Sequence, residues 1–217
     1  MQQAVRVLQF FAAVFGTTVA EGRETIAPIY RQIEPFRDRR AADLSGGMKQ
    51  KLALCCALVH RPRILLLDEP TTGVDAVSRQ EFWDLLDTLR ADGLTIVVST
   101  PYMDEASMCD RIALIQNGRI MEINTLQNIV AEFPKELYAV KADNMYRLNS
   151  DLKKPGKCGT VYIFGEYLHL TPGKEGCGNI KEYLERNGHT GVGIERIEAT
   201  IEDCFMELMS RHRNGNE

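Results

Sequence analysis

The sequence lacks long apolar runs and any excess of basic residues. No stretch of its 217 residues approaches the roughly 18 uninterrupted apolar residues that a membrane-spanning helix needs. Its 26 Lys and Arg are outnumbered by 30 Asp and Glu, which gives a formal net charge of −4. A protein that binds nucleic acid by neutralising phosphates carries the opposite balance. The composition therefore argues against a membrane span and against a nucleic-acid partner.

Cysteine pairs at metal-ligand spacing are also absent. Six Cys occur, but no two form a CxxC pair, which argues against a zinc or redox motif. Cys55, Cys56 and Cys204 lie on apolar helix faces, where a free thiol behaves as a small hydrophobic group. His169 and His189 are isolated, and metal sites need clustered ligands. We therefore expect both histidines in surface or loop positions.

The segment LSGGMKQ, residues 44–50, combines a serine and two glycines with a predicted helix start. Glycines allow the backbone to approach a ligand closely. The unpaired N–H groups of a helix beginning near Met48, together with the Ser45 hydroxyl, would attract an anion. An ordinary turn followed by an N-cap is the alternative, because serine is a common cap.

About twenty residues later, the segment ILLLDEP, residues 64–70, ends an apolar run with two carboxylates. Four apolar residues between Pro62 and Pro70 predict a strand buried on both faces, as in parallel α/β sheets. Ligands bind at the carboxyl ends of such strands. Asp68 is placed to hold Mg²⁺ directly or through water, and Glu69 to orient or deprotonate an attacking water. The alternative is that Asp-Glu-Pro merely caps the next segment.

A predicted helix over 48–60 joins these two motifs, and Thr-Thr-Gly-Val-Asp follows them at 71–75. In order and spacing, this series resembles the ATP-binding subunits of ABC transporters, with signature motif, Walker B strand and D-loop. The resemblance covers roughly residues 1–130 well and the remainder more loosely. It implies an α/β fold, namely a partial P-loop NTPase domain of the ABC type.

The resemblance also implies how the site is built. In this family two ATP-binding subunits dimerise head to tail, and each signature motif closes on ATP held by the partner's P-loop. Carried over, the residues that contact nucleotide across the interface are Ser45, Gly46, Gly47 and Gln50. Glu69 would be the catalytic base, and Asp68 would bind the Mg²⁺ of MgATP. The D-loop residues that couple the two sites would be Gly73 and Asp75.

The phosphate-binding loop GxxxxGK[ST] has no match among the 217 residues. In that motif, backbone N–H groups cradle phosphates and a lysine reaches them. The segment from Gly16 to Gly22 has the wrong spacing and is followed by Arg-Glu. We therefore expect that the first third of the domain, with its Walker A loop, is missing here, and that the isolated chain neither binds nor hydrolyses ATP.

A second departure from the family lies after the predicted strand 94–99. The family normally places a histidine that touches the γ-phosphate at the position occupied here by Pro101. Proline has no side-chain donor and no backbone N–H. Loss of one γ-phosphate donor is expected to slow hydrolysis rather than to abolish it.

From residue 135 onward the pattern changes to that of a small α+β extension. Asn117-Gly118 predicts a hairpin turn, and Thr125 a cap on a short helix that ends before Pro134. Beyond it, 137–142, 160–170 and 193–199 alternate like strands, with Gly165 as an expected bulge. A capping box at 200–203 starts a last helix. The domains expected are therefore 1–134, the C-terminal two-thirds of an ABC nucleotide-binding domain, and 135–217, the extension.

Three functions remain open at this point. The first is an ATP-binding subunit of an ABC exporter, with a second ATP-binding subunit and a membrane permease as partners, on the cytoplasmic face of the membrane. The second is a degenerate partner or truncated remnant that supplies only the signature motif. The third, an SMC or repair-type ATPase, is disfavoured because the chain has no sustained heptads and an acidic balance.

Overall fold

The computed structural model describes residues 3–154, 158–173 and 180–214. They fold into two compact units, Met1–Met108 and Cys109–Glu217. No helix in these ranges is both long and apolar enough to span a bilayer. Mixed helix and sheet agrees with the expected α/β class, whereas the domain boundary after residue 134 stays a prediction.

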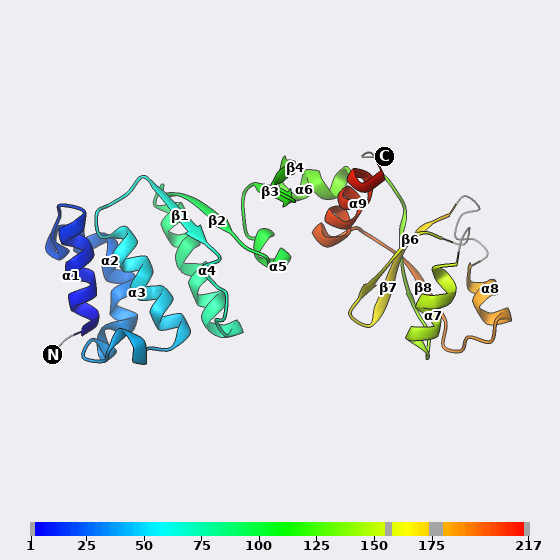
Figure 1. The fold of residues 1–217 in the computed structure, drawn as a ribbon, viewed down its shortest axis with the longest axis horizontal. Coiled ribbons are helices and arrows are strands. Elements are labelled where there is room, and N and C mark those ends of the chain that lie inside the picture. Colours follow the sequence, from blue (N-terminus) through cyan, green and yellow to red (C-terminus); the bar gives the residue numbers. More distant parts are fainter. Residues whose placement is uncertain (1–2, 155–157, 174–179, 215–217) are drawn as a thin grey trace. The chain divides into compact units, whose positions relative to one another are not determined.

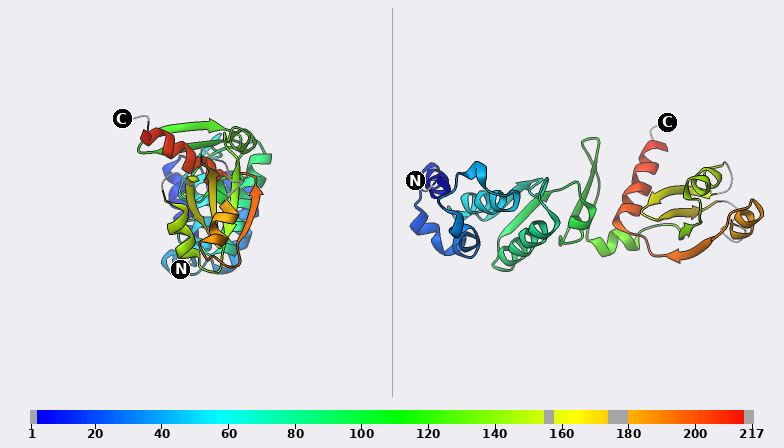
Figure 2. Two further views of the ribbon diagram at one scale, coloured as in Figure 1. Left: turned by 90° about the vertical axis from the view of Figure 1, so that its right-hand side faces the viewer. Right: turned by 90° about the horizontal axis from the view of Figure 1, so that it is seen from below.

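Three helices pack together at the start of the first unit (Figure 1; Figure 2). Their bounds, with those of two short 3₁₀ helices, are α1 Gln3–Val14, α2 Val19–Ile33, η1 Glu34–Phe36, η2 Ala41–Asp43 and α3 Gly46–Leu58. A capping box starts α2: the Glu21 N–H donates to Thr18 Oγ1 at 3.2 Å, and the Thr18 N–H donates to the Glu21 carboxylate at 3.0 Å. These two bonds satisfy N–H groups that the helix itself leaves unpaired.

Gly22 lies inside α2, where the helix comes close to the end of α3. A Cβ at this position would lie 2.2 Å from the Val59 carbonyl oxygen, which no real side chain tolerates. The Gly16–Gly22 segment thus forms a turn and the start of a helix. Gly22 allows α2 to pack closely against the end of α3.

A parallel strand pair follows α3 in the first unit. β1 (Ile64–Asp68) pairs with β2 (Thr95–Ser99) from Ile64 opposite Thr95 to Asp68 opposite Ser99. Between them runs α4 (Ala76–Ala91), and α5 (Met103–Ala106) follows β2. The apolar side chains that α4 buries are Phe82, Trp83, Leu86 and Leu89. This β-α-β order brings the carboxyl ends of both strands to one edge of the sheet.

The expectation that the 64–67 strand is buried on both faces is wrong in the described chain. Leu65 is buried, whereas Ile64 and Leu66 on the opposite face are 59% and 73% exposed. Val97, which pairs with Leu66, is exposed on that face as well. Side chains alternate along a strand, and α4 packs against this strand pair, so only one face of the pair is covered.

An antiparallel hairpin opens the second unit. β3 (Ile112–Gln116) and β4 (Arg119–Asn124) are joined through Asn117 and Gly118. Both turn residues have positive φ, 50° and 71°, as a two-residue hairpin turn of type I′ requires. Thr125 Oγ1 accepts the Asn128 N–H at 3.3 Å and so caps α6 (Leu126–Ala131). The predicted hairpin turn and the predicted cap are both confirmed.

The remainder of the second unit is a four-stranded antiparallel sheet in the order β6-β7-β5-β8. The elements run β5 Leu137–Lys141, α7 Met145–Leu152, β6 Cys158–Phe164, β7 Tyr167–Pro172, α8 Ile180–Arg186, β8 Gly193–Ile197 and α9 Ile201–Asn214. Up to β8 this is the β-α-β-β-α-β succession of the split βαβ motif. The sequence prediction missed α7. It also expected a bulge at Gly165, which lies in the β6–β7 turn with φ 54°.

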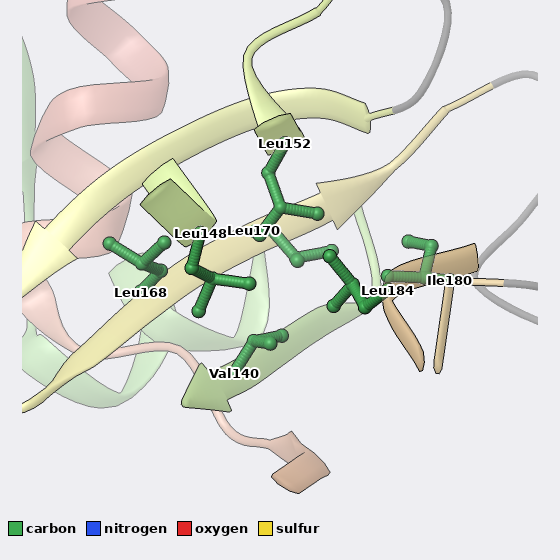
Figure 3. Close-up of a cluster of buried hydrophobic side chains, with 7 residues drawn as sticks. All are labelled: Val140, Leu148, Leu152, Leu168, Leu170, Ile180 and Leu184. Carbon is green, nitrogen blue, oxygen red and sulfur yellow. The ribbon is translucent and has the colours of Figure 1, made fainter. Parts of the chain in front are cut away.

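One face of this sheet packs against α7 and α8 (Figure 3). Leu148 and Leu152 come from α7, and Leu184 from α8; they meet Val140, Leu168 and Leu170 of the sheet, with Ile180 beside them. All seven are buried. Burying a Leu or Val side chain fully is worth about 1.5–3 kcal/mol, so this cluster is the main apolar core of the sheet region.

The expectation of surface or loop positions is wrong for His169, which lies in β7, whereas His189 lies in the loop after α8, as expected; both are bonded to aspartates. His189 is buried, and its Nε2 lies 2.8 Å from Asp151 Oδ2. The hydrogen bonds from Lys154 and His189 hold the pKa of Asp151 below its usual value. His169 Nδ1 lies 2.8 Å from Asp203 Oδ1, near the start of α9. Each pair ties a helix to a distant segment.

Leu65 and Leu66 provide a matched test of the one-sided strand pair. We expect Leu66→Lys to change the free energy of unfolding by less than about 0.5 kcal/mol, because Leu66 is exposed. It should also reduce self-association of the chain, because exposed apolar sheet promotes aggregation. Urea unfolding and sedimentation velocity measure the two effects.

The neighbouring substitution Leu65→Lys is the control. It places a charge on the buried face, and we expect it to cost about 3 kcal/mol or more. Equal stability losses for the two variants would contradict the one-sided burial of β1.

Candidate functional site

The signature segment begins α3, and Ser45 is its N-cap. The Met48 N–H donates to Ser45 Oγ at 3.3 Å, and the Lys49 N–H donates to the Ser45 carbonyl at 2.9 Å. Ser45 and Gly46 are exposed, so the positive end of the α3 dipole faces solvent. The cap expected as the ordinary alternative is therefore present, and it leaves the α3 N-terminus exposed, where its dipole would attract an anion.

The start of α3 is fixed against α4. A Cβ on Gly47 would lie 2.6 Å from the Ser78 Cβ, whereas a Cβ on Gly46 would lie 3.4 Å from the Gly73 carbonyl oxygen. One turn further on, Lys51 is buried, and its Nζ donates to Glu81 at 2.6 Å. Gly47 thus permits close packing of two helices, a role that the sequence analysis did not anticipate. Gly46 of the signature segment lies beside the D-loop, in a place where a Cβ would make only an ordinary contact.

The two acidic residues lie at the carboxyl end of β1, and Ser99 bonds the Asp68 side chain and the Glu69 backbone N–H. Ser99 Oγ donates to Asp68 Oδ1 and accepts the Glu69 N–H at 3.1 Å. The Ser99 carbonyl accepts the same N–H at 3.0 Å. The sequence analysis missed Ser99, although its place at the end of a strand parallel to β1 is a signal that could have identified it.

Glu69 adopts a left-handed backbone conformation, with φ 44°. Non-glycine residues seldom do so, and such strain gathers at functional sites. The Glu69 side chain accepts the Thr72 hydroxyl at 3.1 Å, while the residue remains exposed. The turn that follows β1 therefore presents this carboxylate to solvent at the sheet edge.

The D-loop leads directly into α4. The Val74 N–H donates to the Thr71 carbonyl at 3.1 Å, and Gly73 has φ 74°. Asp75 is the N-cap of α4 and accepts the Ser78 N–H at 2.9 Å. Hydrogen bonds from Ser78 hold the pKa of Asp75 below its usual value. Asp75 is therefore ionised at neutral pH, and it is exposed.

Residues 100–102, called the switch segment here because Pro101 occupies the position of the family's γ-phosphate histidine, follow β2 at the same edge. Pro101 is exposed, and it offers no hydrogen-bond donor. The turn around it is held by Thr100, whose Oγ1 accepts the Tyr102 N–H at 3.1 Å and donates to Glu105 at 2.5 Å. Glu105 is buried, and the sequence analysis missed it.

The structure thus forms two groups of predicted residues. Asp68, Glu69 and Pro101 lie at the shared edge of β1 and β2, where Ser99 bonds Asp68 and Glu69. The signature residue Gly46 lies beside Gly73 of the D-loop. Gln50 is half-buried one turn into α3. Exposed carboxylates at this edge suit Mg²⁺, which prefers oxygen ligands, and the α3 terminus suits a phosphate.

Comparison with known proteins finds a family model, two relatives and a solved structure. The family model described as ABC transporter matches residues 17–72. The probable multidrug ABC transporter ATP-binding protein YbhF of Escherichia coli (strain K12) is 32% identical over 207 residues, which are 93% of this chain and 35% of that protein. Nod factor export ATP-binding protein I of Burkholderia orbicola (strain AU 1054) is 42% identical over 210 residues, 94% of this chain and 66% of that protein.

A solved structure, titled an ATP-binding subunit of an ABC transporter, also matches. It has a TM-score of 0.53 and 28% identity, covering 60% of this chain and 56% of its own. The chain therefore spans about a third of the length of the first relative and about two thirds of the second.

Gly47 and Gly46 allow a test of the α3–α4 contact. We expect Gly47→Ala to destabilise the first unit by about 1–3 kcal/mol, as overpacking does, because its Cβ would collide with Ser78. The matched variant Gly46→Ala should cost less. Adding Ser78→Gly to Gly47→Ala should recover part of the loss. A double variant less stable than both Gly47→Ala and Ser78→Gly would contradict this contact. Urea unfolding of these three variants and of Gly46→Ala measures the stabilities.

Proposed function

Because the chain belongs to the ABC transporter ATP-binding family, we propose that it is part of an exporter-type ATP-binding subunit that couples ATP binding and hydrolysis to transport. The observation that carries this proposal is the joint placement of Asp68 and Glu69 at the β1–β2 edge through Ser99. The names of the relatives, multidrug transport and Nod factor export, support the exporter type.

Each carboxylate has a distinct task in this proposal. Asp68 would hold Mg²⁺, which supplies positive charge to the phosphates when bound. Glu69, exposed and held above the sheet edge by its strained backbone, would accept the proton of the attacking water. Ser99 would keep both groups in place, because it bonds the Asp68 side chain and the Glu69 backbone together.

The signature segment acts on a nucleotide held elsewhere in this proposal. None of the 217 residues forms GxxxxGK[ST], so in this proposal every phosphate loop lies outside them. By the head-to-tail arrangement of the family, the loop that the signature segment meets would belong to a second ATP-binding subunit. Ser45, Gly46, Gly47 and Gln50 would meet its γ-phosphate across the interface. The exposed cap of α3 supports this role, since helix N-termini bind phosphate. Gly73 and Asp75, beside Gly46, would couple the two sites.

Pro101 bears on the rate of hydrolysis. It cannot donate to a phosphate oxygen, so we propose that turnover relies on Glu69, Asp68 and the charges around them and is slower than with a histidine at this position. The second candidate is a degenerate partner that offers only its signature segment. Pro101 favours that reading, whereas the ordered Asp68–Ser99–Glu69 arrangement disfavours it.

A membrane permease is the other proposed partner, with the chain peripheral on the cytoplasmic face. An apolar cavity of about 460 Å³ lies between α1 and α3, lined by residues that include Phe11, Phe15 and Leu52. Lys49 is exposed on its wall. We propose that it receives an apolar helix of the permease with a carboxylate opposite Lys49, because exposed apolar surface of this kind marks interaction sites.

The hydrolytic role is tested with Glu69. In the assembled complex we expect Glu69→Gln to lower kcat about 100-fold or more, since general bases contribute that much, with KM for ATP little changed. Glu24→Gln, a substitution of another exposed glutamate, is the control and should leave the rate unchanged. An unaltered rate in Glu69→Gln would favour the degenerate partner.

The isolated 217-residue chain should bind no MgATP in calorimetry, and tight binding would contradict a phosphate loop outside these residues.

The permease surface is tested with Lys49. We expect Lys49→Glu to weaken binding to the permease about 10-fold by reversing the charge at the contact, while Lys49→Arg should preserve it. Lys153→Glu, an equal charge change in the second unit, is the control. Affinity measured in detergent by surface plasmon resonance distinguishes the variants, and equal affinities throughout would exclude this cavity as the docking site.

A further inference from the structure

Glu105 is a buried carboxylate that no part of the proposed chemistry uses. Its relative exposure is 1%, on the short helix α5 just after the switch segment. An ionised carboxylate in such a place is costly unless hydrogen bonds and opposite charge compensate it. Its partners therefore explain why it is there.

The two oxygens of Glu105 bind two different loops. Thr71 Oγ1 donates to Oε1 at 2.7 Å, and Thr100 Oγ1 donates to Oε2 at 2.5 Å. Thr71 is itself buried and opens the D-loop two residues after Glu69. Thr100 directly precedes Pro101. One side chain thus connects the turn that carries the proposed base with the turn that carries the switch position.

Both threonine hydroxyls donate to Glu105, which occupies the hydrogen of each hydroxyl. The Thr100 oxygen is then oriented to accept the Tyr102 N–H, at 3.1 Å. Because Pro101 has no N–H of its own, this side-chain bond shapes the switch turn.

A third element joins the same group through Arg79 of α4. Its Nε lies 3.8 Å from Glu105 Oε1, its Nη2 3.1 Å from Asp104, and its guanidinium 5.1 Å from the Tyr102 ring centroid. Arg79 supplies the positive charge that a buried carboxylate needs. Since the D-loop ends at Asp75, the N-cap of α4, it is held at both of its ends.

We propose that Glu105 is a positioning residue that makes the D-loop and the switch turn move as one unit. The proposal rests on the function proposed above for its consequence in catalysis, but the mechanical link is independent of it. A nucleotide contact at either turn would be transmitted through Glu105 to the other, and thereby to the backbone that presents Glu69.

Hydrogen–deuterium exchange on the full chain tests the link. We expect Glu105→Gln to raise amide exchange in both 71–75 and 99–102, because an amide cannot accept from both hydroxyls at its two ends. Thr71→Val removes the hydrogen bond between Thr71 and Glu105 and keeps the one between Thr100 and Glu105. It should raise amide exchange at 99–102 as well as at 71–75. Asp104→Asn is the control, since it removes the exposed ion-pair partner of Arg79 and leaves both hydrogen bonds of Glu105 in place. Faster exchange confined to 71–75 in Thr71→Val, or to one loop in Glu105→Gln, would overturn the proposal. If Glu105→Gln does not fold, Thr71→Val and Thr100→Val still decide it.

Kinetics in the assembled complex then test the consequence. Glu105→Gln should lower kcat about 10-fold or more while KM for ATP stays within about twofold, as for loss of an interaction that acts in the transition state. An active wild-type complex with an unchanged kcat in this variant would refute the positioning role. A wild-type complex without ATPase activity would instead count against the proposed function, and the exchange result would still decide whether Glu105 links the two turns.

Discussion

The parallel pairing of β1 with β2 places Asp68 opposite Ser99, and the arrangement of the candidate site depends on that register. Ser99 can bond the Asp68 side chain and the Glu69 backbone together only at this position. A shift by one residue would turn the Ser99 side chain to the other face of the sheet. The same pairing brings Thr100 and Pro101 to the edge where Thr71 begins the D-loop, which allows one buried carboxylate to reach both turns.

A second constraint is the contact between the first turns of α3 and α4. Gly47 against Ser78 brings the helices together, and the buried Lys51 paired with Glu81 holds them one turn later. A lysine with little exposure is stable there because its charge is matched at 2.6 Å. The signature segment therefore begins a helix whose position against α4 is set by these two contacts. This supports a role in which Ser45 and Gly46 must meet a ligand in a fixed geometry.

Local patterns predicted local structure well. The Ser45 cap, the Asn117-Gly118 turn and the Thr125 cap each depend on residues within four positions of one another, and each was predicted from the sequence. Ser99 and Glu105 were missed because both partners of Ser99, and Thr71 as one of the partners of Glu105, are 30 to 34 residues away. The histidine–aspartate pairs were missed for the same reason, with separations of 34 and 38 residues. Such partners are fixed by strand register and helix packing, which the spacing of residues in one segment does not encode.

One face of the 64–67 strand is exposed, although its sequence predicts burial on both faces. Its apolar residues on both faces are suited to a strand covered on both sides, yet in the described chain Ile64, Leu66 and Val97 are exposed. The β3–β4 hairpin likewise exposes Ile115, Ile120 and Ile123. Two-stranded sheets have little stability of their own, and at about 25 cal/mol per Å² of apolar area such faces favour association with further polypeptide. Further polypeptide, whether from the same subunit or from another, would find apolar area to bury on the exposed face of β1 and β2, and the burial of this face is therefore a separate question from the source of the phosphate loop.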